Sequence, residues 1–206
     1  RVGHGRLRDL AVWEVRSPKK QHRPLVMLGR LWYRYQELLR ERPLRTNVLT
    51  AGTAMLLGDT AAQRVEGARR GTPFDVARST VMTTWSACIF TPLFLTWFGL
   101  LDRLFPGAAI RSVATKVLVN QTVMVLPVSA LALAYSTAAE RAVRAALGSE
   151  TWDGSEVAGE VALRWRFDLW RIVCGSCAVW LPVNALNFLF CPVHLRALPA
   201  IVTSVG

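Results

Sequence analysis

The stretch Thr46–Gln63, TNVLTAGTAMLLGDTAAQ, predicts a membrane-embedded helix that carries a polar group. It has no charged side chain before Asp59, and Gln63 follows one helical turn later. Residues four apart share a helix face, so both side chains point the same way. An acid inside a membrane costs about 2.5–3.5 kcal/mol on insertion scales and indicates a function or a polar interior. The alternative is that Asp59 ends the helix at the membrane surface. In either case we expect it to be protonated or paired with an arginine such as Arg78 or Arg171.

Small residues recur at helical spacing in two parts of the chain. One strip lies in the stretch quoted above, and a second lies in a later apolar run. In lipid, such strips allow two helices to approach closely. We therefore expect helix-packing contacts at Gly52, Ala54, Gly58, Ala62, Ala130, Ala134 and Ala138.

The composition combines two properties that are segregated along the chain. The 206 residues are 52% hydrophobic, yet the net charge is +11. Uncharged runs extend over Ser79–Leu101, Val117–Ala139 and, apart from His194, Ile172–Leu195. A membrane span needs about 20 mostly apolar residues. The predicted fold is therefore all-α, an integral membrane bundle of about four transmembrane helices, with a soluble helical bundle as the alternative. The spans are expected near residues 46–65, 77–101, 116–139 and 169–191.

A basic arm is expected over residues 1–28, followed by a membrane domain over residues 29–206. The domain begins with an amphipathic interfacial helix at 29–42, which is rich in the aromatic residues of a membrane belt. Basic side chains near a membrane surface attract anionic lipids, here cardiolipin. The expected lipid or partner contacts are Arg16, Lys19, Lys20, Arg23, Trp32, Tyr33 and Tyr35. Because the sequence begins with Arg1 and a basic stretch, we expect a mitochondrial protein whose transit peptide has been removed.

The sequence offers no catalytic or metal-binding pattern. The three histidines are far apart, and the pair Cys174 and Cys177 has no second pair to complete a zinc site. There is no glycine-rich phosphate-binding loop. We therefore expect no enzyme activity, no metal and no cofactor, and we do not expect nucleic-acid binding.

Polar side chains inside the predicted spans form the candidate site. If they converge, they line a polar seam between helices, because a polar group in lipid needs a partner. Such a seam is either a narrow path for a solute or ion or a hydrogen-bonded plug that holds the helices together. Its expected members are Asp59, Gln63, Gln121, Asn184 and Asn187.

Several motifs together resemble a known family, the Mpv-seventeen / twenty-two-kilodalton peroxisomal membrane protein family. The resemblance covers residues 32–196. It is carried by Trp32-Tyr33-x-Tyr35, Pro43, Thr46, Ala51-Gly52, Gly58-Asp59, Gln63, Pro92, Trp97, Leu101-Asp102, Pro106-Gly107, Lys116, Gln121, Trp180, Asn187-Phe188, Pro192 and Arg196. It implies a small four-span protein of the mitochondrial inner membrane or, alternatively, of the peroxisomal membrane, with pore-like behaviour.

The chain departs from the family pattern within the spans. Thr91-Pro92 stands where the family has Gly-Pro, and Asn120-Gln121 stands where it has Asp-Gln, so an intramembrane acid is lost. Two functions are therefore expected from the sequence. One is a pore-like, non-enzymatic protein of the mitochondrial inner membrane. The other is a structural accessory subunit of a large mitochondrial membrane complex, such as a respiratory enzyme or ATP synthase, without transport activity.

Overall fold

The computed structural model describes residues 23–205, and within these residues every regular element is a helix. The predicted all-α fold is confirmed. The chain divides into two compact units, residues 1–35 and 36–206, each considered by itself. The elements are α1 (Arg23–Glu41), α2 (Pro43–Arg70), α3 (Val76–Thr84), the π-helix η1 (Trp85–Phe90), α4 (Thr91–Leu104), α5 (Ile110–Val119), the π-helix η2 (Asn120–Met124), α6 (Val125–Ala146), α7 (Gly154–Phe167), α8 (Leu169–Phe190), the 3₁₀ turn η3 (Val193–Leu195) and α9 (Ala197–Val205).

Helix α1 begins at Arg23, six residues earlier than the predicted start at residue 29. Pro24 falls in its first turn, where a missing N–H leaves no hydrogen bond broken. Within this helix Trp32 and Tyr33 are exposed, and the rings of Trp32 and Tyr35 lie 5.9 Å apart. The predicted contacts Arg16, Lys19 and Lys20 lie outside the described residues, and Arg23 is the first residue of the helix.

Three continuous helices in the described chain are long and apolar enough to cross a membrane. They are Val76–Leu104, which joins α3, η1 and α4, Ile110–Ala146, which joins α5, η2 and α6, and Leu169–Phe190, which is α8. A helix also forms over the fourth expected span, because α2 covers 28 residues. Its threonine, asparagine, glycine and glutamine residues keep it less apolar than the other three.

The first two membrane-length helices each contain one π-helical turn. In η1 the backbone N–H and the side-chain hydroxyl of Thr91 both bond to the carbonyl oxygen of Ser86, five residues earlier. This i to i−5 pattern is that of a π-bulge inside an α-helix, a feature that occurs often at functional sites. The second π-helical turn, η2, begins with the polar residues Asn120 and Gln121.

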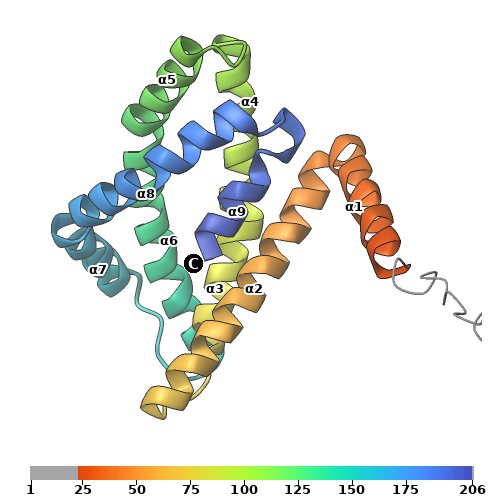
Figure 1. Ribbon diagram of the computed structural model, residues 1–206. Coiled ribbons are helices and arrows are strands. Elements are labelled where there is room, and N and C mark those ends of the chain that lie inside the picture. Colours follow the sequence, from red (N-terminus) through yellow and green to blue (C-terminus); the bar gives the residue numbers. More distant parts are fainter. Residues whose placement is uncertain (1–22, 206) are drawn as a thin grey trace, which may run out of the picture. The chain divides into compact units, whose positions relative to one another are not determined.

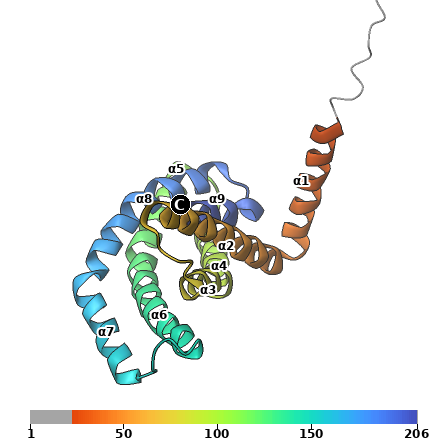
Figure 2. The same cartoon turned by 90° about the horizontal axis from the view of Figure 1, so that it is seen from below.

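Within the unit 36–206 the helices form two packed groups. Helix α2 lies along α3, η1 and α9, while α6 packs against α7 and α8 (Figures 1 and 2). The groups meet where α3 and η1 contact α6, and α5 packs against α8 of the second group. Helices α4 and α5 meet near the short turn at residues 105–109, at the top of Figure 1, and the end of α2 lies at the opposite side near α3.

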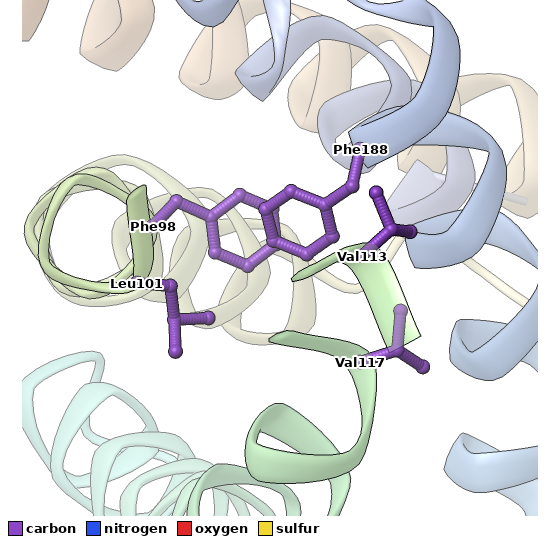
Figure 3. Packing of buried hydrophobic residues seen from close by; sticks show 5 residues of the cluster. All are labelled: Phe98, Leu101, Val113, Val117 and Phe188. Atoms are coloured by element: carbon purple, nitrogen blue, oxygen red, sulfur yellow. The ribbon is translucent and has the colours of Figure 1, made fainter. Parts of the chain in front are cut away.

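The largest buried apolar cluster lies where α4, α5 and α8 meet. The rings of Phe98 and Phe188 lie 4.8 Å apart, and three aliphatic side chains pack around them (Figure 3). The members are Phe98, Leu101, Val113, Val117 and Phe188. A smaller cluster of Ala51, Ala197 and Ile201 joins α2 to α9.

The small residues expected at helix contacts are buried to different extents. A Cβ added to Gly52 would lie 3.3 Å from the Cβ of Ala87, so α2 approaches η1 closely there. Ala62, by contrast, is exposed. The buried face of α2 carries Asn47, Ala51, Met55, Asp59 and Gln63 instead, one position round from the predicted strip. The remaining residues Ala54, Gly58, Ala130, Ala134 and Ala138 are half-buried.

Candidate functional site

Charged side chains gather at both ends of the continuous helix 76–104. Asp75 and Arg78 lie at its start, which we call the Asp75 end, and Asp102 lies at its finish, the Asp102 end. At 1.5 Å of rise per residue, Arg78 and Asp102 are roughly 36 Å apart along the helix. This length exceeds the ~30 Å thickness of the hydrocarbon layer. The two ends therefore lie at opposite faces of the membrane domain.

At the Asp75 end, a hydrogen-bonded network surrounds Asp59. Its Oδ2 accepts hydrogen bonds from Gln63 Nε2, at 2.8 Å, and from the hydroxyl of Ser79. The Nε of Arg78 lies 3.0 Å from Oδ1, an ion pair without hydrogen-bond alignment. The side chain of Asp59 is 2% exposed, so these groups replace the water that a carboxylate would otherwise bind. The pairing with Arg78 agrees with expectation, and α2 continues past Asp59 to Arg70.

Gln63 and Asp75 extend this network to the start of α3 and to α6. Gln63 Oε1 accepts the backbone N–H of Asp75 at 2.6 Å, and its Nε2 lies 2.9 Å from the hydroxyl of Ser79. Asp75 caps α3 by accepting the N–H of Arg78, and it accepts a bond from Arg144 of α6 at 2.7 Å. The Arg78 N–H, and then the Arg144 guanidinium, lower the pKa of Asp75 against the opposing effect of burial. The network therefore ties three helices together at one end.

At the Asp102 end, one carboxylate pairs with two buried cations. Asp102 Oδ1 accepts a hydrogen bond from Lys116 Nζ at 2.7 Å, and its Oδ2 contacts Arg196 Nη1. The Lys116 side chain is 1% exposed and that of Arg196 10% exposed. Both cations also lie over the ring of Phe188, 5.4 and 5.1 Å from its centre. This cluster was not predicted as a site, and it joins α4, α5 and the segment before α9.

Between the two ends lies a partly open cavity lined by uncharged residues, which we call the interior cavity because it lies between the helices. It consists of two adjoining spaces of about 70 and 320 Å³ between η1–α4, η2–α6 and α8, and the larger space also reaches α2 and α9. Its polar lining consists of Ser86, Asn120, Ser129, Ser176, Asn184 and Thr203. Asn120 Oδ1 accepts a hydrogen bond from Trp97 Nε1 at 2.8 Å, whereas the buried Oδ1 of Asn184 has no hydrogen-bond partner among the described residues.

Three aromatic rings lie together in the wall of this cavity. Phe90, Phe94 and Trp180 contact one another with ring centres 5.4 to 6.5 Å apart. Phe90 and Trp180 line both spaces of the cavity, and Phe94 also lines a groove at the Asp102 end. Phe94 therefore lies between the cavity and that groove, and the other two rings pack beside it.

The five predicted seam residues fall into three places. Asp59 and Gln63 belong to the network at the Asp75 end. Asn184 lines the interior cavity, and Gln121 lies near it, where its Nε2 is 3.4 Å from the carbonyl oxygen of Cys177. Asn187 donates to the carbonyl oxygen of Arg196 at 2.8 Å, at the Asp102 end. No hydrogen bond between described residues joins the three places, so the polar groups are spaced along the membrane domain.

The two ends also differ in net charge. Residues 36–45, 102–116 and 196, at the Asp102 end, include seven Lys and Arg against three Asp and Glu. Residues 59–78 and 140–171, at the Asp75 end, include nine of each. The excess of basic charge is therefore confined to the Asp102 end of these residues.

Other reactive groups are dispersed in the described part of the chain. The four cysteines are free, and within residues 23–205 no three His, Cys, Asp or Glu side chains are grouped for a metal ion. His194 is half-buried and lines the groove at the Asp102 end.

Comparisons with known proteins give one consistent similarity. The sequence profile of the Mpv17 / PMP22 family matches residues 154–206. Protein SYM1 of Mycosarcoma maydis is 28% identical over 76% of this chain and 72% of its own length. The mitochondrial inner membrane protein Mpv17 of Danio rerio is 27% identical over 81% of this chain and 86% of its own. PXMP2/4 family protein 1 of Dictyostelium discoideum is 36% identical over 42% and 41%. No solved structure matches the chain.

Proposed function

Because the chain belongs to the Mpv17 / PMP22 family, we propose that it conducts small uncharged polar solutes through its interior cavity. It is a mitochondrial inner membrane protein, as relatives in this family are named. The similarity to a PXMP2/4 family protein fits the peroxisomal membrane as the alternative location. The proposed activity is non-enzymatic and needs no cofactor.

The uncharged polar lining of the cavity is the observation that carries this proposal. Amide and hydroxyl groups from η1, η2, α6, α8 and α9 reach a space bounded by membrane-length helices. Such groups replace the hydrogen bonds that a solute gives up on leaving water. A bare ion would lose its hydration without meeting an opposite charge, which is costly in a medium of low dielectric constant. The cavity chemistry therefore favours uncharged solutes.

Under this proposal, the described arrangement of the helices is a closed state of the path. The rings of Phe90, Phe94 and Trp180 form an apolar constriction, and constrictions of this kind close a path by excluding water. The ion-pair networks at the two ends hold the surrounding helices in place. Removing one ring is expected to open the path, while filling the cavity is expected to block it.

The proposal is tested with the purified protein in liposomes. The rate of osmotic swelling in a small sugar alcohol measures how fast the solute enters. Phe94→Ala should admit the solute faster than the wild type, and adding Ser176→Leu should abolish that gain. Val179→Leu is the matched control, because Val179 lies on the same helix, is 49% exposed and does not line the cavity. If the Phe94→Ala liposomes remain as impermeable as protein-free ones, solute conduction is wrong.

A structural role in a larger mitochondrial membrane complex is the second candidate. It is favoured by α1, where Leu28, Leu31 and Tyr33 are each more than half exposed. Such a surface suits contact with anionic lipid or with another subunit. Native gels in mild detergent test this role, because an accessory subunit should migrate with the complex. Migration solely as a small species would exclude it, and replacing Leu31 with Glu should weaken any association that is seen.

A further inference from the structure

A groove of about 650 Å³ at the Asp102 end is distinct from the interior cavity. It lies between the last turn of α1, the start of α2, α4 and the η3–α9 segment, and it combines two kinds of wall. Leu44, Leu95 and Phe98 provide apolar surface, while Arg40, His194 and Arg196 provide basic groups. The groove is therefore amphipathic, and it lies at the end of a membrane-length helix.

Positive charge at this groove is not balanced by the protein. Arg196 and Lys116 share the single carboxylate of Asp102, which leaves one buried positive charge in excess. The aromatic ring of Phe188 compensates it in part through its electron-rich face. Arg40 adds a further, exposed cation to the lining, and Asp102 is the one acid among the lining residues. An anion in the groove would supply the missing negative charge.

The guanidinium nitrogens of Arg196 indicate where such an anion would bind. Its Nη1 contacts Asp102, and its Nε donates to the carbonyl oxygen of Cys191 at 3.2 Å. Its Nη2 makes no hydrogen bond with the residues that the structure describes. Arginine binds phosphate oxygens well because its donors form a planar fork.

Asn47 provides an independent sign of a ligand. This residue lines the groove and is 2% exposed, and its Nδ2 donates to the carbonyl oxygen of Pro43 at 2.8 Å. That bond fixes the amide orientation and leaves its buried Oδ1 without a hydrogen-bond partner among the described residues. A buried acceptor of this kind is costly unless a donor reaches it. The ligand should therefore carry a hydroxyl group as well as a negative charge.

We propose that this groove binds one anionic phospholipid with a free glycerol hydroxyl, of the phosphatidylglycerol or cardiolipin type. The phosphate lies against Arg40 and Arg196, the hydroxyl donates to Asn47 Oδ1, and the first part of an acyl chain covers the apolar wall. The excess of basic residues at this end matches the charge of the lipid. The site is independent of solute conduction, since lipid binding is measured without any flux.

Native mass spectrometry of the purified, delipidated protein tests this site. The probes are phosphatidylglycerol, phosphatidylcholine and inorganic phosphate. Arg40→Gln removes a lining cation, and Arg45→Gln is its control, because Arg45 is exposed and does not line the groove. Gly99→Leu fills the groove, since a Cβ at Gly99 meets nothing within 4 Å. Gly175→Leu is the control on α8, with equally open space.

Phosphatidylglycerol should bind the wild type and both control variants equally. Arg40→Gln should weaken its binding roughly tenfold, the usual effect of losing one charged hydrogen bond, and Gly99→Leu should abolish it. Circular dichroism checks that each variant is folded. The proposal is overturned if phosphatidylcholine binds as tightly as phosphatidylglycerol, if Gly99→Leu binds lipid normally, or if inorganic phosphate displaces the lipid.

Discussion

Arg78 of α3 is paired with Asp59 of α2, with its Nε 3.0 Å from the buried carboxylate. The same guanidinium also reaches the exposed Glu66, through Nη1 at 2.9 Å. One arginine therefore joins a carboxylate inside the membrane domain to another at its surface. The two ion pairs differ in burial, and their contributions to stability should differ accordingly.

Replacing Asp59 with Asn should destabilise the protein by about 1–3 kcal/mol, less than for a fully buried pair because Arg78 is 34% exposed. The control is Glu66→Gln, which should cost less than about 1 kcal/mol because both partners are exposed by a third or more. Unfolding by denaturant in detergent micelles measures both. Equal losses in the two variants would contradict a buried role for Asp59.

Stability should fall in acid because of Asp75. Its pKa is lowered in the folded protein, chiefly by the backbone N–H of Arg78 and then by Arg144. A lowered pKa stabilises the folded state at pH values above the unfolded-state pKa, and this contribution is lost as pH falls through the folded-state pKa. Asp75→Asn should lower the melting temperature at neutral pH and flatten its decrease in acid. A variant that keeps the full acid dependence would exclude Asp75 as the source.

Asp102 and Lys116 should respond unequally to substitution, although they form one ion pair. Lys116→Met removes one of two buried cations and leaves Asp102 paired with Arg196. It should cost about 1 kcal/mol or less, because no buried charge is left uncompensated. Asp102→Asn leaves two buried cations side by side and should cost about 3–5 kcal/mol. Denaturant unfolding of the two variants tests the order. A larger loss of unfolding free energy for Lys116→Met than for Asp102→Asn would show that Asp102 does not compensate both cations.

Gly52→Leu should separate α2 from η1, because a Cβ at this position already lies 3.3 Å from that of Ala87. Overpacking of this kind costs about 1–3 kcal/mol. Gly175→Leu is the matched control and should leave the melting temperature unchanged, since its Cβ meets nothing within 4 Å. Thermal unfolding followed by circular dichroism separates the two outcomes.

The sequence predicted the helices, and which residues share a helix face, better than it predicted sites built from residues far apart in the chain. The four-residue spacing of Asp59 and Gln63 placed both on one face, and the structure joins them by a hydrogen bond. The cluster of Asp102, Lys116 and Arg196 was missed, although each of the three residues directly borders one of the uncharged runs. That position indicates a membrane surface. Which helix ends lie together at that surface depends on how the helices pair, and no local sequence pattern encodes this pairing.

The interior cavity was also beyond local prediction. A seam was expected from five polar residues, yet the structure distributes them over three places. The physical reason is that the five residues lie at different positions along α2, η2 and α8. Local spacing predicts which residues share a helix face, but it does not predict the height at which two helices meet.

The π-helical turns η1 and η2 also change which face of each long helix is buried on their two sides. One extra residue in a turn shifts the following face by about 100°. Both α3 and α4 contact α2, but α3 also packs against α6, whereas the Phe98 side of α4 packs against side chains of α5 and α8. A one-residue deletion within Trp85–Phe90 would therefore rotate α4 about its axis relative to α3. It would leave the helix intact and turn the Phe98 ring away from Phe188, so that α4 would lose its contact with the apolar cluster that it now forms with α5 and α8.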